Sequence, residues 1–380
     1  MSSEKTVVVV GGGFAGYTLI RRLRKMPKRP RIILVDPRRQ AVFLPLLPDV
    51  VAGKVRAERL LFSLEEFCRK NRIEFRNRSA VKLPNEHTLL LDDGENLSFD
   101  FLALAGGMEP NFYGNEAARA AAFTLASIED ALALRRRILE VADAAKPHTF
   151  LVVGGGYTGV ETASALAYAA RKLKKSGIRV RIAELSPRIL GNLPEGIAGP
   201  VRREIARMGI EVTAPARLEV TGSDEVRLND EILNGITLVW SAGMQAIGFV
   251  RELNFEKDRQ GRLRVEPDLS LPGAEHIFAV GDCAWFQGKA GPLRAAVQFS
   301  WAEGTVVGEN IVRKMTGLPS RPHRPRDYGY LVPVASGRAW GKVLGRRVGG
   351  RAGACLHYLL CVHRTLDKRN RIGLIRDLLV

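Results

Sequence analysis

The fold of this chain is decided by the stretch Thr149-Phe-Leu-Val-Val-Gly-Gly-Gly-Tyr-Thr-Gly-Val-Glu161. The apolar residues that end at Val153 predict a buried strand. Three glycines follow at the spacing Gly-x-Gly-x-x-Gly, namely Gly154, Gly156 and Gly159. The alanine-rich segment from Thr158 to Lys175 then predicts a helix. A strand, a glycine turn and a helix in this order bring a helix N-terminus to a place where a pyrophosphate can bind its N–H groups.

The same pattern opens the chain. Residues 6–10 predict a strand, residues 14–25 a helix, and residues 31–35 a second strand that ends on Asp36. The glycines between the first strand and the helix are Gly11, Gly13 and Gly16. An acidic residue about 20 positions after the last glycine of such a turn accepts hydrogen bonds from an adenosine ribose. Asp36 has that place in the first turn.

Glu184 has the corresponding place after the second turn, at the end of a strand predicted over residues 179–183. A carboxylate there favours a free 2′-hydroxyl and repels a 2′-phosphate, so we expect NADH to be preferred over NADPH. Arg188 lies close enough in the sequence to weaken this preference. The chain therefore carries two separate dinucleotide sites.

Length and composition limit the class of protein. The chain has 380 residues, which is enough for more than one domain, and 46% of them are hydrophobic. No apolar run reaches the roughly 18 residues that span a bilayer. The first residues lead directly into a strand, so we expect no signal peptide and a cytoplasmic chain. The net charge of +18 favours anionic partners, such as acidic lipids, nucleic acid or phosphorylated cofactors, or is a solvated basic surface.

These motifs predict an α/β fold of two Rossmann-like dinucleotide-binding domains, one inserted in the other, with a small C-terminal α+β piece. The first domain is expected over residues 1–109 and 244–320, the inserted one over 110–243, and the terminal piece over 321–380. Within the first domain, residues 43–53 are apolar and contain two prolines. They predict a shaped loop with a short turn rather than one regular helix.

Two Gly-rich units arranged in this way resemble the FAD-dependent pyridine nucleotide-disulfide oxidoreductase superfamily. The segment Ile277-Phe-Ala-Val-Gly-Asp282 is similar to the second flavin signature of that group. The resemblance implies FAD at the first site, with Asp282 bonding the ribityl chain and the backbone of Val81 meeting the adenine. It implies NAD(P)H at the second site.

Within the superfamily the chain most resembles the type II NADH dehydrogenases, which are single-subunit NADH:quinone oxidoreductases. The similar segments cover nearly the whole chain: Phe43-Leu-Pro-Leu-Leu, Gly154-Gly-Gly-Tyr-Thr-Gly-Val-Glu161, Val239-Trp-Ser-Ala-Gly243, Gly337-Arg-Ala-Trp-Gly-Lys-Val-Leu-Gly345 and Lys368-Arg-Asn-Arg371. The resemblance implies hydride transfer from NADH to flavin and transfer of two electrons to a quinone. The family pattern Ala-Gln-x-x-x-Gln keeps only Gln298 here, because Ala302 replaces the second glutamine.

The resemblance assigns roles to two further side chains. Glu161 is expected to face the nicotinamide and flavin, where it positions NADH or manages a proton, although a carboxylate there also stabilises a helix N-terminus. The amide of Gln298 either donates to a quinone carbonyl or caps nearby backbone. The expected cofactor-binding residues are Gly11, Gly13, Phe14, Ala15, Gly16, Asp36, Val81, Gly281 and Asp282 for FAD, and Gly154, Gly156, Tyr157, Thr158, Gly159, Glu184 and Gly243 for NADH.

Thiol and metal chemistry are not expected. The loop near the flavin holds no cysteine, and Cys355 and Cys361 do not share a helix face. The histidines have no metal-binding spacing, so we predict no metal site.

The C-terminal run from Leu356 to Leu379 alternates leucines with arginines and lysines. This pattern favours a helix that lies on an anionic membrane surface, and it is also compatible with a solvated face over an ordinary core stripe. We therefore expect a protein peripheral to the inner face of the cell membrane, with no specific nucleic acid partner, and leave a homodimer open. The alternatives are a basic flavoprotein with slow turnover that binds nucleic acid or a partner, or a related reductase that uses sulfide or a protein electron carrier.

Overall fold

The computed structural model describes residues 4–26, 29–144, 146–174, 177–220, 225–289 and 291–379. Within them the chain forms two compact units, each of which is described by itself. Unit 1 comprises the described residues of 1–41, 63–109 and 244–327, and unit 2 those of 42–62, 110–243 and 328–380. Two helix ends expected from the sequence, Ala145 and Lys175, lie outside the described residues.

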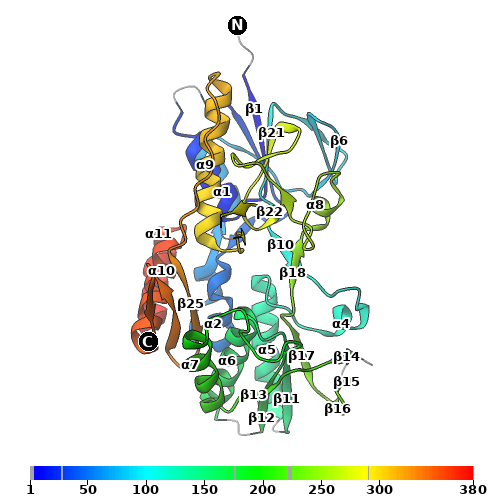
Figure 1. Ribbon diagram of the computed structural model, residues 1–380, viewed down its shortest axis with the longest axis vertical. Coiled ribbons are helices and arrows are strands. Elements are labelled where there is room, and N and C mark those ends of the chain that lie inside the picture. Colours follow the sequence, from blue (N-terminus) through cyan, green and yellow to red (C-terminus); the bar gives the residue numbers. More distant parts are fainter. Residues whose placement is uncertain are drawn as a thin grey trace. The chain divides into compact units, whose positions relative to one another are not determined.

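A six-stranded sheet forms the centre of unit 1, in the order β20-β21-β9-β1-β2-β5 (Figure 1). All neighbouring pairs are parallel except β20 with β21. The strands are β1 (Thr6–Val10), β2 (Arg31–Val35), β5 (Glu74–Arg76), β9 (Phe101–Leu104), β20 (Ser270–Leu271) and β21 (Ala274–Ala279). Residues 7–10 are four successive buried valines, as expected for a strand that is covered on both faces of a parallel sheet.

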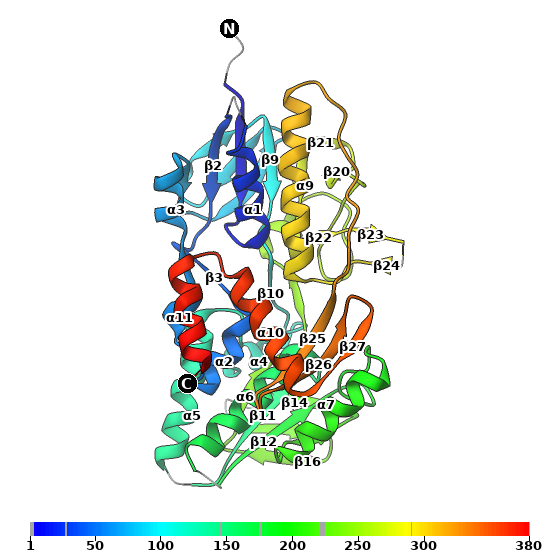
Figure 2. The same ribbon diagram turned by 90° about the vertical axis from the view of Figure 1, so that its left-hand side faces the viewer.

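Two long helices of unit 1, α1 and α9, pack side by side (Figure 2). Small residues allow this close approach, because a Cβ at Gly304 would lie 2.2 Å from the Ala15 carbonyl oxygen. Helix α3 begins with an N-cap, in which the Ser63 hydroxyl accepts a hydrogen bond from the Glu66 N–H at 3.0 Å. The helical segments of this unit are α1 (Phe14–Leu23), α3 (Leu64–Asn71), α8 (Gly248–Glu252), η3 (Gly281–Cys283) and α9 (Val297–Met315).

Short strands complete unit 1 and carry the chain across the unit boundaries. Those within unit 1 are β6 (Ala80–Asn85), β7 (Thr88–Leu91), β8 (Asn96–Ser98), β18 (Met244–Ala246), β19 (Leu263–Arg264), β22 (Ala284–Trp285), β23 (Gln287–Gly288) and β24 (Gly291–Pro292). Those at the boundaries are β3 (Gln40–Val42), β4 (Leu61–Ser63) and β10 (Met108–Pro110).

Unit 2 is built around a parallel sheet in the order β13-β12-β11-β17. Its strands are β11 (His148–Val153), β12 (Ile178–Ala183), β13 (Glu211–Thr213) and β17 (Thr237–Trp240). An antiparallel sheet accompanies it, made of β14 (Leu218–Val220), β15 (Glu225–Leu228) and β16 (Glu231–Asn234). The helical segments are η1 (Leu44–Leu46), α2 (Leu47–Ala52), η2 (Ala57–Leu60), α4 (Glu116–Ala121), α5 (Ile128–Ala144), α6 (Tyr157–Lys172) and α7 (Glu195–Arg207).

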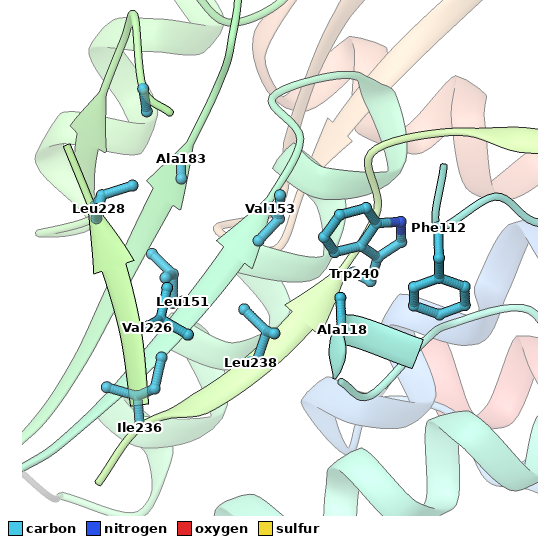
Figure 3. Packing of buried hydrophobic residues seen from close by; sticks show 11 residues of the cluster. Phe112, Ala118, Leu151, Val153, Ala183, Val226, Leu228, Ile236, Leu238 and Trp240 are labelled. Carbon is cyan, nitrogen blue, oxygen red and sulfur yellow. The ribbon is translucent and has the colours of Figure 1, made fainter. Parts of the chain in front are cut away.

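Apolar side chains from both sheets of unit 2 form one of its cores (Figure 3). Leu151 and Leu238 come from the parallel sheet, and Val226 comes from the antiparallel one. Trp240 closes the cluster by stacking on Phe112, with ring centroids 5.3 Å apart. The indole N–H of Trp240 donates to the Asn111 carbonyl at 2.8 Å, so the polar end of this buried ring is satisfied.

The C-terminal part of unit 2 is an α+β piece, as predicted. It consists of β25 (Gly329–Val334), β26 (Arg338–Val343), β27 (Arg346–Val348), α10 (Gly350–Arg364) and α11 (Lys368–Leu379). The sequence suggested one amphipathic run over residues 356–379, whereas the structure has two helices. The break has a local cause, because the Asp367 carboxylate accepts the Arg369 N–H at 2.6 Å and so starts α11.

The predicted fold class, an α/β chain with two Rossmann-like units, is confirmed. The compact units differ from the expected domains in two segments, since residues 42–62 and 328–380 group with the second glycine turn. The division of the chain into cofactor-binding domains stays a prediction. The apolar segment 43–53 forms a turn of 3₁₀ helix followed by α2, which ends at Gly53 with a left-handed φ of 70°.

Candidate functional site

The first glycine turn joins β1 to α1 in unit 1. Gly11 has a φ of +102°, and a Cβ at Gly16 would lie 2.0 Å from the Gly11 carbonyl oxygen, so both positions require glycine. Gly13 precedes the helix, and a Cβ there would meet nothing within 4 Å. Phe14 and Ala15 form the first turn of α1. The open space at Gly13 and the helix N-terminus fit a bound pyrophosphate.

Asp36 directly follows β2 and is fully buried. Its carboxylate accepts the Gly12 N–H at 2.8 Å and the Arg38 N–H at 2.9 Å. The Arg38 guanidinium also donates to both carboxylate oxygens at 3.0 Å. These contacts attach the acidic residue directly to the glycine turn, which is the geometry that a ribose-binding carboxylate needs.

The predicted flavin signature lies in the same unit. Gly281 has a φ of +72°, and its N–H donates to the Glu303 carboxylate at 2.6 Å. Burial raises the pKa of Asp282, whereas a hydrogen bond from the Ser300 hydroxyl at 3.4 Å lowers it. A Cβ at Gly281 would lie 3.1 Å from the Ala15 Cβ, so this segment closes on the first glycine turn. Unit 1 therefore brings the two predicted flavin motifs together.

Val81 was expected to meet an adenine through its backbone. It lies on β6 in unit 1 and is 39% exposed. The register between β6 and β7 is irregular between Ala80 and Lys82, at the position of Val81. The contact with an adenine stays a prediction.

The second glycine turn joins β11 to α6 in unit 2 and has the same geometry. Gly154 has a φ of +102°, and a Cβ at Gly159 would lie 1.8 Å from the Gly154 carbonyl oxygen. A Cβ at Gly156 would meet nothing within 4 Å. Tyr157 and Thr158 open the helix. This turn also fits a bound pyrophosphate.

Glu184 follows β12 at the place of the ribose-binding carboxylate. It accepts the Gly155 N–H at 2.5 Å and the Ser186 N–H at 2.7 Å. Arg188, which the sequence placed nearby, directs its guanidinium to Glu195 at 3.3 Å and to the Gly191 carbonyl at 3.4 Å. The carboxylate is thus held by backbone N–H groups of the turn.

Gly243 ends the turn after β17. A Cβ at this position would lie 2.2 Å from the Tyr113 hydroxyl, which donates to the Ala242 carbonyl at 3.2 Å. Gly243 also accepts the Asn111 N–H at 3.0 Å through its own carbonyl. The sequence analysis did not single out Tyr113. Its φ of +52° and 68% exposure mark it as an unusual surface residue beside this turn.

A small cavity surrounds Glu161, the predicted catalytic carboxyl. It has a volume of about 20 Å³ and lies entirely within unit 2. The lining comes from the α2 segment, α6, the end of β25 and α10: Pro45, Pro48, Asp49, Glu161, Ser164, Ala165, Pro333, Val334, Ala335 and Tyr358. Glu161 stands two residues beyond the last glycine of the second turn, so the cavity adjoins the start of α6.

The charge state of Glu161 is strongly affected by these surroundings. Burial, together with the negative charge of Asp49, raises its pKa to about 8. Burial also raises the pKa of Asp49, whereas Lys54 and a hydrogen bond from Tyr358 lower it. The two carboxyl groups share one cavity, and a proton on one of them is favoured when the other is ionised. A carboxyl that keeps its proton near neutral pH can act as a general acid.

Asp49, Lys54 and Tyr358 were missed by the sequence analysis. A signal existed for Asp49, because it is the lone acidic residue in the apolar segment 43–53. No local signal marks Tyr358, which lies on α10 and reaches this cavity only through the folding of unit 2.

Gln298 lies in the first turn of α9, in unit 1. Its side-chain amide donates to the Asp327 carboxylate at 2.9 Å, which the Arg294 guanidinium also contacts at 2.9 Å. The amide is therefore engaged by a carboxylate side chain of the same unit. Glu161 and Gln298 belong to different units, and a role of Gln298 toward a quinone stays a prediction.

Three of the four cysteines have buried environments that suppress thiol reactivity. Burial raises the pKa of Cys68 to about 12 and that of Cys283 to about 11. Burial also raises the pKa of Cys361 well above its usual range. Cys355 is exposed on α10. These surroundings favour flavin chemistry without redox-active thiols.

Comparison with known proteins finds oxidoreductases among the relatives of this chain. A family model described as pyridine nucleotide-disulphide oxidoreductase matches residues 5–302. The chain is 25% identical over 393 residues to a type II NADH:quinone oxidoreductase of Staphylococcus saprophyticus, covering 98% of this chain and 97% of the relative. It is 27% identical over 374 residues to the demethylphylloquinone reductase NdbB of Synechocystis, covering 94% of this chain and 91% of the relative.

A solved structure has the same fold. NDH2 from Plasmodium falciparum in complex with NADH superposes with a TM-score of 0.85 at 16% identity, covering 99% of this chain and 98% of that chain. In the described part of the chain, no helix is both long enough and apolar enough to cross a bilayer.

Proposed function

We propose that this chain, which belongs to the pyridine nucleotide-disulphide oxidoreductase family, is an FAD-dependent enzyme that oxidises NADH and reduces a quinone. The observation that carries the proposal is the pair of glycine turns with equal backbone geometry, one in each unit. The names of the relatives, type II NADH:quinone oxidoreductase and demethylphylloquinone reductase, support a quinone as acceptor.

Each nucleotide has its own set of residues in this proposal. The turn from Gly11 to Gly16 would hold the FAD pyrophosphate, Asp36 the adenosine ribose, and Asp282 the ribityl chain. When bound, the flavin accepts a hydride from NADH and passes two electrons to the quinone. The turn from Gly154 to Gly159 would hold the NADH pyrophosphate, and Glu184 its ribose. The accompanying residues of both sites are Phe14, Ala15, Val81, Gly281, Tyr157, Thr158 and Gly243.

Glu184 gives the proposed enzyme its preference for NADH. Its carboxylate is fixed by the N–H groups of Gly155 and Ser186, so both oxygens keep one orientation. A ribose 2′-hydroxyl can donate to this carboxylate, whereas a 2′-phosphate would be repelled. Arg188, the residue that could offset the repulsion, is engaged by Glu195.

The overall reaction consumes one proton: NADH, a proton and a quinone give NAD⁺ and a quinol. The hydride supplies two electrons and one of the two quinol hydrogens, and the other arrives as a proton. Glu161 is suited to hold that proton, because burial raises its pKa to about 8. The side-chain amide of Gln298 donates to Asp327. In this proposal the same N–H group donates to a quinone carbonyl when the quinone is bound.

We propose that the enzyme acts on an anionic membrane surface, at the inner face of the cell membrane. The exposed side chains of the C-terminal helix support this location. On α11 the side chains of Ile372 and Ile375 are 57% and 46% exposed. Lys368, Arg369 and Arg376 are exposed on the same helix. Exposed isoleucines among basic side chains match a helix that inserts its apolar residues between acidic lipid headgroups. A homodimer, left open by the sequence, would be tested by analytical ultracentrifugation.

The proposed function is tested by steady-state oxidation of NADH with menaquinone, ubiquinone and ferredoxin analogues in parallel. We expect a yellow protein that oxidises NADH faster than NADPH and reduces at least one quinone. A colourless preparation that FAD does not reconstitute, or turnover with ferredoxin alone, would sink the proposal. Flotation with phosphatidylglycerol vesicles, and with phosphatidylcholine vesicles as the uncharged comparison, tests the membrane surface, and the double variant I372D/I375D should lose binding.

A further inference from the structure

The cavity beside Glu161 contains a second carboxyl group that is held by a specific hydrogen bond. Asp49 is 8% exposed, and its Oδ1 accepts the Tyr358 hydroxyl at 2.8 Å. Asp49 comes from α2, Glu161 from α6 and Tyr358 from α10. All three line the same cavity. Three separate elements of unit 2 therefore direct titratable groups at one small space.

The walls of the cavity are joined by hydrogen bonds through Ala335. The Lys54 ammonium donates to the Ala335 carbonyl at 2.6 Å and lies 4.4 Å from the centre of the Tyr168 ring. The Ala335 N–H donates to the Ser164 hydroxyl at 3.0 Å, and that hydroxyl donates to the Glu161 carbonyl at 2.9 Å. These bonds connect the α2 segment and β25 to α6 and hold the cavity in one shape.

We propose that Asp49 and Tyr358 are positioning residues for Glu161, in which Tyr358 fixes the Asp49 carboxylate across the cavity and this carboxylate keeps a proton on Glu161. The proposal deepens the proposed function and rests on it, because the proton is the one that quinone reduction consumes. Asp49 itself touches neither nucleotide in this account and acts only through Glu161.

The asymmetry between the two carboxyl groups supports this division of roles. Burial raises the pKa of Asp49, but a nearby cation and a hydroxyl donor both favour its charged form and oppose that rise. For Glu161 both causes, burial and the charge of Asp49, favour the neutral form and raise its pKa. The proton is therefore expected on Glu161 and the negative charge on Asp49.

The elements that pack around the cavity differ in the titratable groups that they bring. From the α2 segment, burial lowers the pKa of Lys54, and the opposite charge of Asp49 raises it. From α10, burial and the charge of Asp49 raise the pKa values of Tyr358 and Cys361, which both stay neutral. The positive charge of Lys172 lowers the pKa of Lys54, and that of Arg364 lowers the pKa of Cys361. Also on α10, burial lowers the pKa of His357, so this imidazole is neutral at the pH of the titration. The end of β25 contributes Pro333, Val334 and Ala335, which do not titrate.

The size of the cavity fits a proton-sharing site. A volume of about 20 Å³ has room for one water molecule. The polar groups that line it, Asp49, Glu161, Ser164 and Tyr358, provide the two to four partners that a buried water needs. Such a water would bridge the two carboxyl groups and let a proton pass between them.

The test is a pH titration of the flavin-loaded, full-length protein by infrared difference spectroscopy of the carboxyl C=O stretch, which needs no substrate. The variant E161Q identifies the Glu161 band. We expect this band to titrate near pH 8 in the wild type and ~1 pH unit or more lower in D49N, because the repelling charge is gone. The matched control is D143N, which removes an exposed carboxylate from α5 of the same unit and should leave the midpoint unchanged.

A second variant, Y358F, keeps the ring and removes only the hydroxyl. Because Asp49 then loses a bond that favours its charged form, the Glu161 midpoint should fall, though by less than in D49N. A midpoint in Y358F and in any folded D49N that equals the D143N value would overturn the proposal. If D49N does not fold, Y358F alone decides.

A kinetic measurement separates this proposal from the proposed function. The alkaline limb of the kcat profile for quinone reduction should move to lower pH in D49N, while the KM for NADH changes less than twofold. A protein that shows the infrared shift but reduces no quinone keeps the carboxyl coupling and refutes the proposed function. A protein that reduces quinone but shows no infrared shift keeps the proposed function and refutes the carboxyl coupling.

Discussion

The two glycine turns of this chain are almost the same object built twice. Gly11 and Gly154 share a φ of +102°, and a Cβ at Gly16 or Gly159 would clash with the first glycine's carbonyl at 2.0 or 1.8 Å. In both, a carboxylate at the end of the next strand accepts an N–H from the turn. A short motif thus reproduces its backbone geometry in two units, because the constraints act over a few residues.

The turns differ two residues past the third glycine, where the chemistry differs most. In unit 1 this position is Thr18, whose hydroxyl donates to the Phe14 carbonyl of its own helix at 2.7 Å. In unit 2 it is Glu161, a carboxyl in a cavity with a pKa raised to about 8 by burial. The shared backbone fits a dinucleotide in each unit, whereas the side chain at this position is a hydroxyl in unit 1 and a buried carboxyl in unit 2.

The two carboxylates proposed to bind ribose differ as well. Asp36 is fully buried and paired with the Arg38 guanidinium at 3.0 Å. Glu184 is partly exposed and held by backbone N–H groups, while Arg188 pairs with Glu195.

The largest expected effect comes from the third glycines. In G159A the new Cβ would meet the Gly154 backbone oxygen, which cannot move aside as a side chain would, so we expect a loss of about 3 kcal/mol in the free energy of unfolding of unit 2. NADH affinity should fall at least 100-fold while flavin content is retained. The mirror variant G16A should lose flavin instead. Flavin absorbance and NADH titration check both.

G156A is the matched contrast, since its Cβ meets no protein atom within 4 Å. Thermal stability should stay at the wild-type value, and NADH should bind more weakly because the methyl group occupies the phosphate approach. Equal behaviour of G159A and G156A would show that the turn does not bind a nucleotide in the proposed way.

The next largest effect concerns the position two residues past the third glycine, which is Thr18 on α1 and Glu161 on α6. E161Q should lower kcat for quinone reduction about 100-fold without loss of flavin, as expected when a positioned proton donor is removed. T18V should change kcat by less than twofold. In the wild type kcat should fall above about pH 8, where Glu161 loses its proton. Rates of the two variants across pH 6–10 decide whether the comparison holds.

The same residue predicts a pH dependence of stability. The folded protein holds a proton on Glu161 up to about pH 8, whereas the unfolded chain releases it near its usual pKa of about 4.3. The free energy of unfolding should therefore fall as pH rises between these values. E161Q should remove this part of the slope, measured as Tm against pH with the wild type alongside.

The smallest expected effect concerns Glu184 and Asp36, the two carboxylates proposed to bind ribose. E184A should reduce the preference for NADH over NADPH about tenfold in kcat/KM, or ~1.4 kcal/mol, because the repulsion of the 2′-phosphate is lost. R38A serves as the comparison in the other unit and should leave this ratio unchanged while weakening flavin retention slightly, since its guanidinium is 53% exposed. An unchanged ratio in E184A would remove Glu184 from the ribose site.

Much of the fold followed from local patterns. The strand, turn and helix of both dinucleotide motifs were predicted because their signals lie within a few residues of one another. The break before α11 could also have been predicted from Asp367, which caps the helix that follows it. The grouping of residues 42–62 and 328–380 with the second turn has no such local signal.

By itself, the amino-acid sequence determined that the chain contains two dinucleotide turns, where each helix N-terminus lies, and which acidic residue follows each turn. Tertiary structure alone decided what surrounds Glu161. Asp49 and Tyr358 are separated by most of the chain, and they meet at 2.8 Å only because α2 and α10 pack in the same unit as α6. Burial and the approach of a second charge set the pKa of a carboxyl, and both depend on residues remote in the sequence.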